Sequence, residues 1–173
     1  YDDKLQDMSE GWASSMNTML WKDGTQDSKE VAGIQYLISE TPTTGTVGGL
    51  DRASFAKWRN RQGSGASFTA SAANQVLTAS LKDEVRQLKR YGGTPNLILC
   101  GSTAMAKLEL EANAKSTYTQ SNDKSIDISS QVISIQGIGT FRYDPTLDDL
   151  SKDDYIYFID TKNFRFNVAG LGD

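Results

Sequence analysis

The stretch from Ala72 to Gly101 constrains the fold more than any other part of the sequence. Its apolar residues recur at helical spacing, and charged residues occupy the opposite face. We expect a helix of about 20 residues, about 30 Å long. Ser71 is the expected N-cap, and Gly92–Gly93 is expected to end the helix. After Pro95, the apolar run Asn96–Cys100 predicts a buried strand. The apolar stripe of the helix consists of Val76, Leu77, Leu81, Val85 and Leu88.

Composition limits the chemistry that the chain can perform. The 173 residues contain no histidine, which excludes Ser-His-Asp arrangements and histidine metal ligands. The single Cys100 excludes an internal disulfide, and the net charge of −4 argues against a protein that coats nucleic acid. No apolar run approaches the roughly 18 residues of a membrane span. We therefore expect no metal, no cofactor and no membrane association.

The remaining patterns predict an α+β fold. Asp2–Trp21 is an amphipathic pattern, and its stripe of methionine, leucine and tryptophan favours packing against the core or another subunit. Ser102 is the expected cap of a helix that runs through Ala114. Residues 133–143 alternate as one extended segment, and residues 155–159 and 164–168 predict further strands. The expected order is helix, loop, helix, strand, helix and three strands, with the helices against a mostly antiparallel or mixed sheet.

Two polar segments allow more than one interpretation. Lys115–Ser130 is a surface excursion that could contact another subunit or be only a solvated loop. Five aspartates between Asp144 and Asp154 could hold a cation, but they match no calcium-binding spacing. Ordinary surface charge explains the acidic loop without a metal.

The segment Thr46–Asn60 is the most informative for function, and three hypotheses compete for it. A phosphate-binding loop lacks the required glycine spacing and the following Lys-Ser/Thr. Ser54 and Lys57 match the Ser-x-x-Lys of penicillin-binding enzymes, but no Ser-Asp-Asn or Lys-Thr-Gly follows. The third hypothesis is a loop that docks on a partner through residue types enriched at interface hot spots. Its candidate contact residues are Gly48, Gly49, Asp51, Arg52, Trp58 and Arg59.

The same segment resembles the Thr-Val-Gly-Gly-(Leu/Ile)-Asp-Arg…Trp-Arg-Asn run of tailed-bacteriophage major capsid proteins with the Hong Kong 97-like fold. Weaker similarities follow the family's order along the chain. They comprise Lys22-Asp23-Gly24, the turn into a strand at 92–99, Gly137 to Asp144 with Pro145, and Tyr157-Phe158-Ile159-Asp160. Asp160 stands where Asn is more usual in the family, and Lys57 stands where an aromatic is common.

This resemblance implies a structural α+β capsid protein with the Hong Kong 97-like fold. Residues 1–24 would be the C-terminal part of the spine helix, and residues 25–173 the axial and peripheral capsid domain core, ending before the natural C-terminus. The partners would be copies of the chain in hexamers and pentamers of an icosahedral shell, which encloses DNA without binding it specifically. The implied location is the virion capsid, and the host cytoplasm during assembly.

The family also carries an N-terminal arm and an extended loop ahead of the spine helix. The chain therefore resembles a fragment, for which we expect a monomer or small oligomer at micromolar concentration, without shells. Two alternatives stay open: a serine acyl-enzyme that uses Ser54 and Lys57, and an encapsulin-like compartment shell protein on the same fold.

Overall fold

The computed structural model describes residues 2–71, 74–114, 132–162 and 164. The chain divides into two compact units, Tyr1–Gln62 and Gly63–Asp173. The first unit contains α1 (Asp2–Trp21), α2 (Ile34–Leu37), strands β1 (Thr46–Val47) and β2 (Leu50–Asp51), and the 3₁₀ turn η1 (Ala56–Trp58). The second unit contains η2 (Ala66–Phe68), α3 (Val76–Arg90), β3 (Leu97–Cys100), α4 (Ser102–Ala114), β4 (Val132–Ile135), β5 (Gly139–Tyr143), α5 (Pro145–Asp149) and β6 (Ile156–Ile159). The chain is thus an α+β protein, as the sequence predicts.

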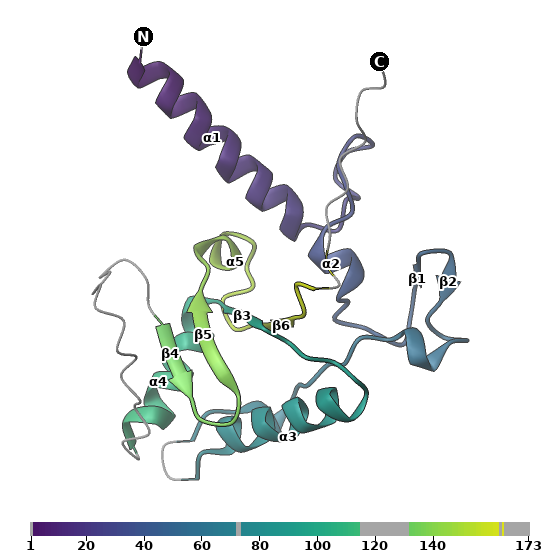
Figure 1. Cartoon of the computed structure of the whole chain (residues 1–173), viewed down its shortest axis with the longest axis vertical. Coiled ribbons are helices and arrows are strands. Elements are labelled where there is room, and N and C mark those ends of the chain that lie inside the picture. The colour runs from purple at the N-terminus through teal and green to yellow at the C-terminus, as the bar shows by residue number, and fades with distance from the viewer. Residues whose placement is uncertain (1, 72–73, 115–131, 163, 165–173) are drawn as a thin grey trace. The chain divides into compact units, whose positions relative to one another are not determined.

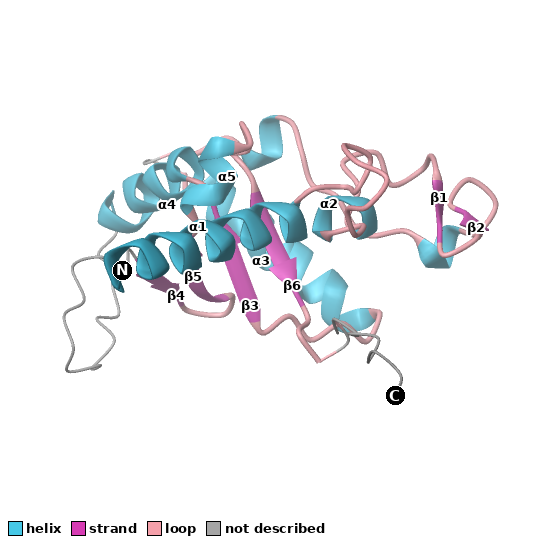
Figure 2. Cartoon of the chain, turned by 90° about the horizontal axis from the view of Figure 1, so that it is seen from above, coloured by secondary structure: helices cyan, strands magenta, loops and turns pink. Residues whose placement is uncertain are grey.

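A four-stranded mixed sheet forms the centre of the second unit, with the strand order β4-β5-β3-β6 (Figure 2). Strand β3 runs parallel to β5 and antiparallel to β6, and β4 pairs antiparallel with β5. The register places Ile98 beside both Phe141 and Phe158. The prediction of a mixed sheet is confirmed.

The core of this unit lies between one face of the sheet and helices α3 and α4. Every second residue of a strand faces the core, and there it meets residues that recur every three or four positions along the helices. The cluster of buried residues comprises Leu77, Leu81, Ile98, Cys100, Ala104, Met105, Leu108, Ile133, Ile135 and Phe141. The rings of Phe141 and Phe158 add an edge-to-face contact with 6.2 Å between centroids. The expected inner faces of both helices are therefore confirmed.

The expectation of one extended segment over residues 133–143 is wrong. The chain reverses between Ile135 and Gly139, and β4 and β5 form a hairpin. Gly137, at φ +88°, supplies the left-handed residue that the reversal requires. Ile133 pairs with Phe141, so the alternating apolar residues still share the core face after the chain turns back. Alternation alone could not distinguish a long strand from a hairpin that preserves it.

The N-terminus of α3 also differs from expectation. The helix begins at Val76 rather than near Ala72, and Ser71 does not cap it. Ser71 instead accepts a hydrogen bond from the Asn74 amide at 3.3 Å, in a turn that precedes the helix. Gln75 is the N-cap residue, and its backbone has the left-handed conformation. Its side chain makes no capping hydrogen bond. The orphan N–H groups of the first turn must find another acceptor.

That acceptor is Glu111, a fully buried carboxylate on α4. Its Oε1 accepts the amide of Leu77 at 3.0 Å, and its Oε2 accepts the amide and hydroxyl of Thr78 at 2.8 and 2.7 Å. The amide of Ser71 donates to Oε1 at 2.7 Å. Burial raises the pKa of Glu111, but these hydrogen bonds outweigh it and hold the pKa below its usual value. Glu111 thus ties α3, α4 and the preceding turn together.

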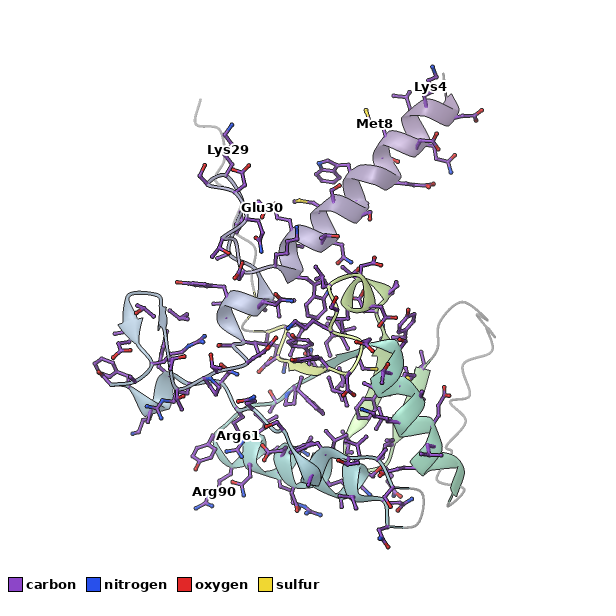
Figure 3. All side chains as sticks on the ribbon, turned by 180° about the vertical axis from the view of Figure 1, so that it is seen from behind. Lys4, Met8, Lys29, Glu30, Arg61 and Arg90 are labelled. Atoms are coloured by element: carbon purple, nitrogen blue, oxygen red, sulfur yellow. The ribbon has the colours of Figure 1, made fainter. Side chains whose placement is uncertain are left out.

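Helix α1 has the bounds that the sequence predicts. Among the described residues, only those at its C-terminal end are shielded from solvent by other parts of the chain. Trp21 is buried and Met16 is half-buried. Leu5, Met8 and Trp12 are between 59% and 68% exposed, and Figure 3 shows Met8 projecting from the helix. The predicted core packing therefore does not extend to the first half of the stripe.

Removing the Glu111 carboxylate should destabilise the second unit. We expect Glu111→Ala to lower the free energy of unfolding by about 3 kcal/mol, because several buried N–H groups lose their acceptor. Denaturant unfolding followed by far-UV circular dichroism measures the loss. Glu109→Ala, on another side of the same helix, is the control and should change stability by about 0.5 kcal/mol or less. Equal losses in the two variants would contradict the capping role.

The same carboxylate should contribute to the acid sensitivity of the fold. Because the pKa of Glu111 is lowered in the folded chain, its stabilisation is present above the unfolded pKa, about 4.3, and is lost as the pH falls through the folded value. Glu111→Gln should be less stable than the wild type at pH 7 and lose less stability on acidification. Urea midpoints measured from pH 7 to pH 3 test this. Parallel curves for the two proteins would contradict it.

Candidate subunit-contact loop

The segment Thr46–Asn60 is built on a short hairpin (Figure 1). Strands β1 and β2 pair antiparallel, with Val47 opposite Leu50. Gly48 and Gly49 form the two-residue turn, with φ of +59° and +80°. A turn with two positive φ angles matches the twist of the flanking strands and strongly favours glycine. The sequence Gly-Gly between these residues therefore specifies a tight hairpin, and not a phosphate cradle.

Two arginines in this segment bind the chain's own backbone. Arg52 is 3% exposed, and its guanidinium donates to the carbonyls of Tyr36 and Leu37 at 3.1 and 2.7 Å. These carbonyls lie at the C-terminal end of α2, where positive charge is favoured. Arg59 donates to the carbonyls of Arg52 and Ala53 at 2.6 and 2.8 Å. Both charges hold the loop in one conformation.

Asn60 closes the segment by pairing with the backbone of Ser39. Its amide nitrogen donates to the Ser39 carbonyl at 2.8 Å, and its Oδ1 accepts the Ser39 N–H at 3.1 Å. One side chain thus supplies both partners that a neighbouring strand would otherwise offer. The contribution of Asn60 depends on a residue 21 positions away, so it cannot be found from local patterns.

Asp51 organises the turn that follows the hairpin. Its carboxylate accepts the Ser54 hydroxyl at 2.7 Å and the amides of Ala53 and Ser54 at 3.0 and 3.2 Å. The hydroxyl of Ser54, followed by these amides, lowers the pKa of Asp51. Asp51 is therefore a turn-stabilising residue.

This geometry does not favour the hypothesis of a Ser54/Lys57 enzyme. The Ser54 hydroxyl donates its proton to Asp51, whereas an acylating serine needs a base that removes that proton. Lys57 is exposed to solvent, whereas an activated lysine usually lies in a desolvated pocket. The pair does not form the nucleophile-base arrangement that the motif requires.

Trp58 combines an anchored edge with an exposed face. Its Nε1 donates to the Val47 carbonyl at 3.0 Å, and its ring lies against the hairpin turn at Gly48. The side chain nevertheless remains 50% exposed, and nearby Phe55 is 54% exposed. Large aromatic side chains that are fixed in position and exposed are typical of interface anchors. The loop is thus held by its own polar groups and presents an aromatic surface.

The acidic loop has internal structural roles. Asp144 caps α5 by accepting the Thr146 amide at 3.0 Å, with Pro145 at the first helical position. Asp148, rather than Ser102, caps α4, because it accepts the Ser102 amide at 2.8 Å. Asp153 accepts the Thr103 hydroxyl at 2.6 Å. Among the described residues, no group of three or more potential ligands is arranged to hold a metal ion.

Cys100 is fully buried in the core and unpaired with any other cysteine. Burial, with a smaller contribution from the charge of Asp148, raises the pKa of its thiol to about 12. The predicted loop at residues 115–130 and most of the predicted strand at 164–168 lie outside the described residues. Within the described part of the chain, none of the helices combines the length and apolarity that crossing a bilayer requires.

One of the comparisons with known proteins gives the class to which this α+β chain belongs. The family model described as SU10 major capsid protein matches residues 1–170. The chain therefore belongs to the SU10 major capsid protein family, whose members are structural proteins of phage heads. Searches of curated proteins and of solved structures returned no significant match.

The buried Arg52 provides a direct test of the loop's internal bonds. Arg52→Ala should destabilise the first unit by about 2 kcal/mol, because two carbonyls lose a charged donor. All three tryptophans lie between residues 12 and 58, so tryptophan fluorescence reports this unit alone. Lys57→Ala is the matched control, since it removes an exposed cation from the same loop. Equal fluorescence-detected midpoints for the two variants would show that Arg52 is not a stabilising contact.

Proposed function

We propose that this chain is a shell subunit that associates with copies of itself in hexamers and pentamers of an icosahedral phage head. The shell encloses DNA, which the net negative chain does not bind specifically. The proposal places the subunit in the virion, and in the host cytoplasm during assembly. Membership of a major capsid protein family supports it.

The proposal includes the Hong Kong 97-like fold. Residues 1–24 then form the C-terminal part of the spine helix, and residues 25–173 belong to the axial and peripheral domain. Helix α1 ends at Trp21, close to the boundary that the proposal places after residue 24. Residues 48–59 form the subunit-contact loop in this proposal.

The observation that carries the contact proposal is the environment of Trp58. Its indole N–H is satisfied within the loop, so the exposed ring needs no further polar partner. The ring can be covered by a neighbouring subunit at little entropic cost, because it is already held in place. Arg52 and Arg59 maintain this geometry by binding the backbone.

Self-association can be measured directly. Sedimentation velocity at rising protein concentration should show reversible formation of species larger than the monomer, and electron microscopy can then identify rings or shells. Interfaces of a closed shell repeat around symmetry axes. A chain that remains strictly monomeric at every concentration would contradict the proposal.

The contribution of Trp58 can be separated from folding. Trp58→Ala should weaken self-association by tenfold or more, as expected for an aromatic hot spot worth about 2 kcal/mol, and should lower the stability of the chain less. Tyr91→Ala is the matched control, because Tyr91 is an exposed aromatic at the end of α3. Equal losses of stability and association for Trp58→Ala would instead make Trp58 an internal packing residue.

A further inference from the structure

The loop that exposes Phe55 and Trp58 is also the most basic part of the chain. Residues 51–62 contain Arg52, Lys57, Arg59 and Arg61 against the single carboxylate of Asp51, a net charge of +3. Arg52 and Arg59 bind the chain's own backbone carbonyls, whereas the side chains of Lys57 and Arg61 are exposed. We call the exposed surface formed by Phe55, Lys57, Trp58 and Arg61 the basic aromatic face. Its partner must offer negative charge together with an apolar contact.

Residues 144–155 of the same sequence offer that combination. The segment 144–154 contains five aspartates and one lysine, a net charge of −4. Lys107 forms an ion pair with Asp154, so the surface remains negative after that partner is counted. Asp149, Asp154 and the ring of Tyr155 are exposed. We call these three residues the acidic tyrosine face.

The geometry of the acidic tyrosine face is fixed by internal contacts. Asp144 and Asp148 are engaged as helix caps, which holds α5 and the following turn in place. Tyr155 stacks on Tyr157 with 6.2 Å between ring centroids, and the Lys152 ammonium lies 4.7 Å from the centre of its ring. A preformed surface of this kind loses little conformational freedom on binding.

Helix α1 is the other acidic and apolar candidate, but its geometry is less suitable. Successive helical residues are about 100° apart. Asp3, Asp7 and Glu10 therefore lie on the side of α1 opposite the exposed Met8 and Trp12. A partner in contact with the apolar stripe would not meet these carboxylates. The acidic tyrosine face presents its charge and its aromatic ring in one segment.

We propose that the basic aromatic face of one copy docks on the acidic tyrosine face of a neighbouring copy. This inference rests on the proposed self-association and names the surface that the loop contacts. Because the two faces differ, the contact is heterologous, and such contacts close into rings when the rotation between subunits allows it. The charge pairs orient the approach, and the aromatic rings supply the buried apolar area.

Reciprocal charge reversal tests the pairing. The first variant carries Lys57→Glu and Arg61→Glu, and the second carries Asp149→Lys and Asp154→Lys. Each variant alone should show about tenfold weaker self-association by sedimentation velocity, since two attractive pairs become repulsive. An equimolar mixture should recover association to within about twofold of wild type, because the reversed faces of the two variants complement each other. Wild-type association should also weaken as salt is raised, since the charges lie near the surface.

Two further variants keep the test decisive. Asp149→Lys alone leaves the Lys107–Asp154 pair intact, so it replaces the double variant if circular dichroism shows that the latter does not fold. Asp7→Lys with Glu10→Lys reverses the same number of charges on α1, and it should give no recovery when mixed with the variant that carries Lys57→Glu and Arg61→Glu. Recovery with this control would identify α1 as the partner and overturn the proposal.

Other outcomes would also overturn the pairing. Failure of the mixture to recover, although combining all four substitutions in one chain does recover association, would indicate an intramolecular contact. Unchanged association of the Lys57→Glu, Arg61→Glu variant, together with loss of salt-sensitive duplex DNA binding, would indicate a nucleic-acid surface. If wild type associates and the mixture does not recover, the pairing alone fails. A strictly monomeric wild type removes the proposed function as well.

Discussion

The second unit depends on one buried carboxylate. Burying an ionised group is unfavourable unless hydrogen bonds replace its water. Glu111 meets that condition with four donors, three of them backbone amides. The helix that carries Glu111 and the helix that it caps both pack on the core face of the sheet. The position of α3 is therefore specified by directional bonds as well as by apolar packing, which alone tolerates sliding.

The contact loop is also held by charged side chains that bind backbone groups, but its exposed surface is aromatic. Arg52 and Arg59 bind carbonyl groups, and Asn60 pairs with the Ser39 backbone. Polar residues in this segment thus hold the backbone, while Phe55 and Trp58 remain exposed. The arrangement is the reverse of an ordinary surface loop, in which apolar residues anchor and polar residues face water.

Elements whose signals are local could be predicted from the sequence. The bounds of α1 and α4, the strand after Pro95 and the tight turn at Gly92 all follow from periodicity and turn chemistry. Helix caps were predicted poorly, because Glu111 and Asp148 come from segments distant in sequence. Glu111 lies in an ordinary Leu-Glu-Leu-Glu pattern, and only its burial distinguishes it from Glu109.

The contact loop was predictable as a segment but not in its internal bonds. Its glycines, Trp58 and Arg59 distinguish the segment in the sequence, because such residues are unusual in a polar stretch. The burial of Arg52 depends on the carbonyls of α2, and the pairing of Asn60 depends on Ser39. The exposed first half of α1 shows the converse limit, since an apolar stripe predicts a contact without naming its partner.

The placement of Glu111 also bears on the order in which the chain can fold. Translation completes α3 at Arg90, about twenty residues before Glu111 is added. Until then, the amides of Leu77 and Thr78 lack their native acceptor, and the first turn of α3 is only marginally stable in isolation. Strand β5, the parallel partner of β3, is synthesised later still. Stable docking of α3 must therefore wait until α4 has also left the ribosome, and until then the apolar stripe of α3 lacks the partners that cover it in the folded unit.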